Sequence, residues 1–224
     1  AGKAGFRAGQ YMASTDEIYI TVKGKGGHAA TPELLIDPIL IAGEILSALQ
    51  QVISRKGNPS IPSVLSFGRF IADGRTNIIP DEVKLEGTFR TFNEEWRREA
   101  HAHIERIATG IAESMGGSCK VEIANGYPYL VNDEGLTGVF KSVGKSLLGD
   151  DFLDLSLRMT AEDFAYFSQR VPSVFYRFGV ANADKGIDAN LHTPEFDIDE
   201  ESMKTAASLM SLAALDFLKY FSEK

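Results

Sequence analysis

Apolar and polar residues follow two regular spacings over the first half of the chain. They alternate over residues 16–23, which predicts a strand with one covered face. From 36 to 54 the apolar positions recur at helical spacing, and the stretch ends at a Lys-Gly-Asn-Pro stop signal, which predicts a long amphipathic helix. Strand patterning returns over 64–71 and 82–92, with Arg90 on the polar face of the second of these strands.

A second helix and a fourth strand complete this pattern. Apolar positions from Trp96 to Met115 predict a helix that ends at a Gly-Gly pair, and residues 119–123 alternate as a strand. The order β-α-β-β-α-β is typical of the ferredoxin-like split βαβ arrangement, in which four strands lie under two helices. We expect this domain at residues 11–124. The Gly- and Ala-rich residues before it have no periodicity and are expected to be a connector.

The last hundred residues have the mixed pattern of an α/β layer. We expect Asn132 to cap a helix, Thr160 and Asp163 to form the capping box of a short helix, 173–180 to be a buried strand, and a final helix to begin near Asp199. One or two clear strands would leave a sheet edge and helix faces uncovered. Residues 125–224 are therefore expected to be part of a domain.

Charge and composition narrow the classes of partner and location. The chain has 31 Asp and Glu against 23 Lys and Arg, a net charge of -8, which disfavours nucleic acid as a partner. No apolar run approaches the roughly 20 residues of a membrane span, so no membrane association is expected. The single cysteine, Cys119, cannot form an intramolecular disulfide, which favours a reducing, cytoplasmic location. The start at Ala1 instead of methionine suggests truncation or processing.

Two loop histidines are candidates for chemistry. His28 follows a strand in the glycine-rich loop GKGGH, where flexible backbone allows close approach and an imidazole could donate to a developing oxyanion. His192 precedes the last helix in LHTPEFD, where a ring nitrogen could ligate Zn²⁺. On local sequence alone, an incidental turn histidine and a locally hydrogen-bonded loop histidine are the favoured alternatives. His101 and His103, two residues apart on a helix, are expected to lie on its surface.

Two further polar groups have functional and structural alternatives. Asn77 and Arg90 can form an anion clamp, since a guanidinium offers a planar fork to a carboxylate, although a strand-surface salt bridge explains Arg90 as well. Glu162 and Asp163 could contact substrate, but acidic residues in a first helical turn are expected from the helix dipole alone. The residues by themselves leave the function open.

Four motifs, taken in order, closely resemble the aminoacylase and carboxypeptidase-G-like metallopeptidase family. They are GKGGHAATP at 24–32, RTNIIPDEVKLEGTFRTF at 75–92, RMTAEDFAYF at 158–167 and LHTPEFD at 191–197. The branch they resemble most holds hippurate hydrolase, N-acyl-amino-acid and N-acetyldiaminopimelate deacetylases and auxin-conjugate amidohydrolases. Each motif is modest alone, but their order across nearly the whole chain makes coincidence improbable.

The resemblance implies both an architecture and residue roles. The ferredoxin-like region, 11–124, would be the lid and dimerisation domain of a homodimer, and 125–224 the C-terminal part of a two-layer or three-layer α/β catalytic domain. His28 would polarise the scissile carbonyl, often in the partner subunit's active site. Asn77 and Arg90 would hold substrate, Arg90 by its carboxylate, Thr160 would line the pocket and His192 would be a metal ligand. The role of Glu162 stays undecided.

The activity implied is metal-dependent hydrolysis of the amide bond of acetyl-, benzoyl- or similar N-acyl amino acids, or of small peptides, with two Zn or Mn ions. The family's upstream segment, with a His or Cys ligand pair, a bridging acid and a Glu-Glu pair, does not occur here, so we expect a fragment that is inactive alone. The alternatives are a non-catalytic dimerisation module and a small-molecule-binding module. For a dimer, we expect contact through the helix at 36–54 and an adjacent strand edge.

Overall fold

The computed structural model describes residues 1–223, and the chain divides into two compact units. The sandwich unit consists of residues 12–129 together with the short segment 159–163. The terminal unit consists of residues 1–11, 130–158 and those from 164 onward. Most of the sandwich unit is thus one continuous stretch of sequence, 12–129, inserted between two segments of the terminal unit.

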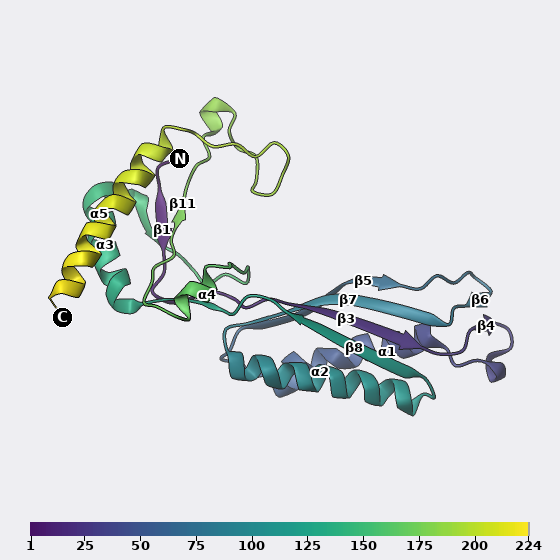
Figure 1. Ribbon diagram of the computed structural model, residues 1–224. Helices are drawn as coiled ribbons and strands as arrows, with labels where there is room; N and C mark the ends of the chain where they lie inside the picture. The colour runs from purple at the N-terminus through teal and green to yellow at the C-terminus, as the bar shows by residue number, and fades with distance from the viewer. Residues whose placement is uncertain (224) are drawn as a thin grey trace. The chain divides into compact units, whose positions relative to one another are not determined.

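The sandwich unit is a four-stranded antiparallel sheet covered by two helices on one face (Figure 1). The sheet order is β5-β7-β3-β8, with β5 and β8 at the edges. Its six elements are β3 (Asp16–Lys23), α1 (Pro38–Gln51), β5 (Ser63–Ile71), β7 (Glu82–Thr91), α2 (Glu94–Ser114) and β8 (Ser118–Asn125). This order and pairing confirm the predicted ferredoxin-like fold class.

Side-chain caps fix where both helices begin. Asp37 accepts hydrogen bonds from the backbone N–H groups of Ile39 and Leu40 at the start of α1, and Pro38 occupies the first helical position. Asn93 caps α2 by accepting from Trp96 N at 2.8 Å. After α1 the chain makes one wider helical turn, Val52–Lys56, before Gly57.

The core of this unit lies between the sheet and the helices. Alternate residues of β3 and β7 meet the apolar stripes of α1 and α2, and each fully buried aliphatic side chain contributes about 1.5–3 kcal/mol. The core residues include Ile18, Ile20, Val22, Ile41, Ile45, Leu49, Val83, Leu85, Phe89, Trp96 and Ile104.

A short ribbon lies at one end of the sheet, where β3 ends and β7 begins (Figure 1). It consists of β4 (Gly27–His28) paired antiparallel with β6 (Ile78–Ile79), and the 3-10 turn Pro32–Leu34 follows β4. Two glycines make the close packing there possible. A Cβ at Gly24 would collide with the carbonyl oxygen of Ile36, and one at Gly26 with that of Ile79.

The terminal unit has a small sheet with the start of the chain at its centre. Strand β1 (Ala4–Phe6) lies between β10 (Phe152–Asp154), which is parallel to it, and β11 (Arg177–Phe178), which is antiparallel. The other elements are β2 (Gly9–Met12) paired with β9 (Leu130–Asn132), α3 (Glu134–Leu148), the 3-10 turns Gly149–Asp151 and Ala183–Lys185, α4 (Ala165–Ser168) and α5 (Ser202–Ser222).

The core of the terminal unit is small and aromatic. Phe6 stacks on Phe152 with ring centroids 4.7 Å apart, and Phe140 of α3 meets both rings. Leu209 and Ala213 of α5 close this cluster. The rest of α5 is less covered, since six of its large apolar side chains are exposed: Met203, Met210, Leu212, Leu215, Leu218 and Phe221.

Several expectations for the terminal unit were wrong. The first ten residues are not a connector, because they form β1 and most of β2. Asp133, not Asn132, caps α3, while the buried Asn132 side chain bridges Arg7 O and Phe175. Thr160 and Asp163 form no capping box, since the short helix is Ala165–Ser168 and follows Phe164. The strand expected at 173–180 is reduced to Arg177–Phe178.

Within the described chain, no helix combines the length and the apolar character that crossing a bilayer requires.

Candidate active site

The structure brings His28 and Asn77 together at the β4–β6 ribbon. His28 pairs with Ile78 across the ribbon, and the next residue, Ala29, donates its N–H to Asn77 O at 3.1 Å. Asp81 supports the loop by accepting from Gly26 N at 2.8 Å. Both His28 and Asn77 are exposed, so the ribbon presents an imidazole and a carboxamide at the end of the sheet.

A backbone contact selects the tautomer of His28. The Nδ1 atom accepts a hydrogen bond from Ala30 N at 3.1 Å, so in the neutral ring the proton is on Nε2. The Nε2–H group is then a donor. An imidazole in this state can donate to a carbonyl oxygen that becomes negatively charged.

Arg90 lies near the other end of the same sheet. It pairs with Val64 of β5 and follows Phe89, which pairs with Asp16 at the start of β3. Its Nη1 is buried and has no hydrogen-bond partner within residues 1–223. A groove on the uncovered sheet face borders it, lined by residues that include Thr15, Ser66, Gly68 and Thr88. A buried, unpaired guanidinium N–H beside a groove is suited to an anionic oxygen.

Thr160 lies at the same end of the sandwich unit as Arg90. Its carbonyl oxygen accepts from Ala13 N at 3.1 Å, and the adjacent Ser14 exchanges hydrogen bonds with Thr91 at the end of β7. Thr160 is exposed.

The two pairs of candidate residues are far apart along the sheet. Arg90 lies eight residues beyond Glu82, where β7 begins next to the ribbon, and a strand rises about 3.3 Å per residue. This places the ribbon roughly 26 Å from Arg90. Within one chain, His28 and Asn77 therefore do not share a site with Arg90 and Thr160.

His192 occupies an exposed loop of the terminal unit. It is the one non-glycine residue of the described chain with a positive φ, at 66°, a conformation that costs energy and often marks a functional position. Asp199 closes the base of the loop by accepting from Asn182 Nδ2 at 2.6 Å and Lys185 Nζ at 2.8 Å. These hydrogen bonds lower the pKa of Asp199 to about 2.

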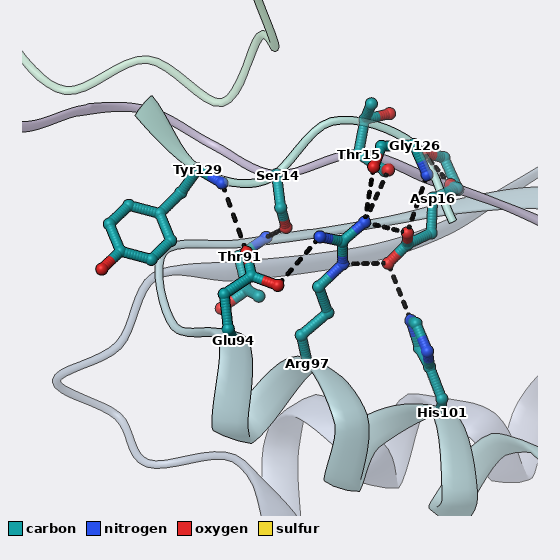
Figure 2. A network of polar contacts seen from close by, with 10 residues as sticks. Ser14, Thr15, Asp16, Thr91, Glu94, Arg97, His101, Gly126 and Tyr129 are labelled. Carbon is teal, nitrogen blue, oxygen red and sulfur yellow. Dashed lines mark hydrogen bonds and ion pairs between the residues drawn. The ribbon is translucent and has the colours of Figure 1, made fainter. Parts of the chain in front are cut away.

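A buried polar cluster, which was not predicted from the sequence, lies at the end of the sandwich unit where β3 begins (Figure 2). The fully buried Asp16 carboxylate accepts from the Arg97 guanidinium and from His101 Nε2, the latter at 2.7 Å. Burial alone would raise the pKa of Asp16, but the hydrogen bonds from His101 and Arg97 outweigh it, and the pKa lies below its usual value. The expectation that His101 is a surface residue was wrong.

The pattern did hold a signal for this cluster. Asp16 shares the inward face of β3 with Ile18 and Ile20, and Arg97 falls one turn before Ala100 and His101 on α2. A charged residue in an inward position requires a buried partner of opposite charge.

Comparison with known proteins identifies the family. Residues 16–115 match the model of a peptidase dimerisation domain, M20_dimer. The chain is 34% identical over 220 residues to N-acetylcysteine deacetylase of Bacillus subtilis, covering 97% of this chain and 56% of that protein. It is 32% identical over 222 residues to the IAA-amino acid hydrolase ILR1-like 4 of Arabidopsis thaliana, covering 97% and 50%. The chain belongs to the M20 peptidase family.

A solved M20 structure has the same fold. The YXEP protein of Bacillus subtilis, described as a dinuclear metal binding peptidase, is 29% identical, with a TM-score of 0.76 over 98% of this chain and 54% of that one. The chain thus spans about half the length of the M20 relatives that it matches.

The residues described here do not by themselves fit a two-metal M20 centre. Between Ala1 and Glu223, no group of three or more His, Cys, Asp or Glu side chains is arranged to hold an ion. His192 is a single donor, and a dinuclear site needs several.

Proposed function

We propose that this chain is the C-terminal part of a metal-dependent amidohydrolase that cleaves N-acyl amino acids or small peptides. The main observation in its favour is the tautomer and the exposed position of His28. Its exposed ring is held by the Ala30 N–H so that Nε2–H is the donor, the arrangement required to stabilise the oxyanion of an amide under attack. The relatives named as a deacetylase and an amino acid hydrolase support the same bond class.

The other candidate residues have matching roles in this proposal. Arg90 binds the substrate carboxylate through its unpaired Nη1, and Asn77 and Thr160 orient the substrate. His192 supplies one ligand to a Zn or Mn centre whose other ligands lie outside this chain.

We propose that the terminal unit is part of a larger catalytic domain, and that the sandwich unit is an insertion in that domain. We propose that residues outside this chain complete the domain by covering the sheet edges and the exposed apolar side chains of α5. The terminal unit, residues 1–11, 130–158 and those from 164 onward, then supplies only the C-terminal part of that domain, and the isolated chain is inactive.

The experiment compares the chain with a version extended to the full length of its relatives. Both are assayed on a panel of N-acetyl and N-benzoyl amino acids, with and without a chelator. We expect turnover by the extended protein only, abolished by chelator and restored by Zn²⁺ or Mn²⁺. Inactivity of both proteins towards the whole panel would contradict the proposal and favour a binding or dimerisation module.

We further propose that the active protein is a homodimer in which the β4–β6 ribbon of one subunit reaches the other. The distance between His28 and Arg90 supports this arrangement, since one chain cannot join them. The contact surface is the open edge of β5 with the neighbouring helix α1, where Phe70 is 43% and Leu40 is 55% exposed. The match to a dimerisation domain supports dimerisation of the sandwich unit.

Sedimentation of the 224-residue chain tests the dimer. The unchanged chain is expected to be dimeric at micromolar concentration, and Phe70→Lys is expected to weaken association at least about tenfold by placing a charge in an apolar contact. Tyr19→Lys is the matched control, because Tyr19 is 40% exposed but lies within the sheet, not at its edge. A monomer at all concentrations, or equal effects of the two substitutions, would contradict the proposed surface.

A further inference from the structure

The two connections at the ends of the long stretch 12–129 pass through the buried cluster, at the end of the sandwich unit where β3 begins. The chain enters this unit through residues 12–15 and leaves it through 126–129. The two connections pair with each other, since Thr15 N donates to Tyr127 O at 3.0 Å and Gly126 N donates to Thr15 O at 2.9 Å.

Arg97 joins these two connections to helix α2 (Figure 2). Its Nη2 donates to the carbonyl oxygens of Thr15 and Gly126, both at 3.2 Å, as well as to Asp16. Its Nη1 donates to Glu94 Oε2 at 3.0 Å, and the other oxygen of Glu94 accepts from Tyr129 N at 3.3 Å. One side chain on α2 therefore holds the entering and the leaving segment together.

The entering segment also contacts Thr160 and Thr91, which is the chain neighbour of Arg90. Ala13 N donates to Thr160 O at 3.1 Å, which ties the Thr160 loop to the segment. Ser14 N donates to Thr91 O at 2.8 Å, and Thr91 N donates back to Ser14 Oγ at 3.2 Å. Since Thr91 follows Arg90 on β7, the segment that begins at Ala13 fixes Arg90 and Thr160 relative to each other.

We propose that Asp16 and Arg97, with Glu94 and His101, form a clamp that locks both connections to α2 and thereby positions Arg90 and Thr160. The positioning role rests on the proposed function, whereas the locking of the connections does not.

The geometry requires an arginine at position 97. The guanidinium donates to two carboxylates and two carbonyl oxygens. Its N–H groups point outward in several directions from one planar group, so a single side chain can reach all four acceptors. A lysine ammonium has the same charge but only three donors on one atom, so it cannot hold both connections and Glu94 at once. Charge alone therefore does not replace the clamp.

Hydrogen exchange measured on the 224-residue chain tests the locking. In Arg97→Lys we expect exchange at least about tenfold faster in the peptides covering 12–16 and 125–130, whose amides bond within the clamp, with unchanged exchange in α1. Arg98→Lys is the matched control, because Arg98 is the next residue on α2 and is exposed. Glu94→Gln, a milder change, is expected to accelerate exchange at Tyr129 alone.

The outcomes separate a clamp from a general contribution to stability. If Arg97→Lys accelerates hydrogen exchange equally in the two connections and in α1, the proposal is overturned. Unchanged exchange in the connections of this variant would also overturn it. For the positioning role, Arg97→Lys in the full-length protein is expected to raise KM for N-acyl amino acids about tenfold with a smaller change in kcat. Unchanged KM would overturn that role. If the unchanged full-length protein hydrolyses no substrate, the proposed function fails, while the exchange result stands.

Discussion

An Arg97→Met variant is expected to lose about 3–5 kcal/mol of unfolding free energy, because it leaves the Asp16 carboxylate buried without its main cation. Urea unfolding followed by fluorescence measures this loss for the sandwich unit directly. Trp96 is the one tryptophan of the sequence and lies in the core of that unit, with Nε1 donating to Ser63 Oγ at 3.0 Å.

Two comparisons show whether the loss comes from the unpaired charge. Arg98→Met removes an exposed arginine from the same helix and is expected to change stability by less than about 0.5 kcal/mol. Combining Arg97→Met with Asp16→Leu removes both charges, and we expect this double variant to be more stable than Arg97→Met alone. A loss below about 1 kcal/mol in Arg97→Met would show that the pair is poorly coupled.

In the full-length enzyme, His28→Ala is expected to lower kcat by about 10²–10³, since it removes the donor proposed to stabilise the oxyanion. KM should change much less, because this hydrogen bond strengthens only as charge develops on the carbonyl oxygen. Steady-state kinetics on an N-acetyl amino acid checks both constants.

The control for this variant is His103→Ala. His103 is a histidine of α2 whose Nδ1 lies 2.7 Å from Arg106 Nη2, and no role in the site is proposed for it. We expect its kcat to remain within about twofold of the unchanged enzyme, as for most substitutions outside a site. A His28→Ala enzyme that also keeps its kcat within that range would exclude His28 from the chemistry.

Local patterns were sufficient to predict the sandwich unit. Each strand of its four-stranded sheet has at least eight residues and each of its two α-helices at least fourteen, long enough for alternation or helical spacing to appear clearly. The caps at Asp37 and Asn93, which set where the helices begin, were found only in the structure.

The candidate site could be predicted only in part. The loop motifs indicated His28 and Asn77 as candidates, and the structure places them side by side on the ribbon. The clamp was missed because Asp16 and Arg97 are 81 positions apart in the sequence. The residues next to each of them in sequence do not show that its charge is buried against the other. Pairing across such a distance depends on the register of β3 against α2, which no short window contains.

The terminal unit was predicted less well because its strands are very short. β1, β10 and β11 have two or three residues each, too few for a periodic pattern. Tertiary pairing, not local preference, makes them strands. The same holds for Asn132, which could cap a helix by its sequence position but instead joins Arg7 to Phe175.

The central place of β1 has a consequence for the order of folding during synthesis. Phe152, the partner of Ala4, is synthesised 148 residues after it, and closing so long a loop is costly for a disordered chain. The continuous segment 12–129 can fold meanwhile, and its ends already pair at Thr15 and Tyr127. A folded insertion brings β1 close to the incoming strands, so assembly of the sandwich unit shortens the search that completes the terminal sheet.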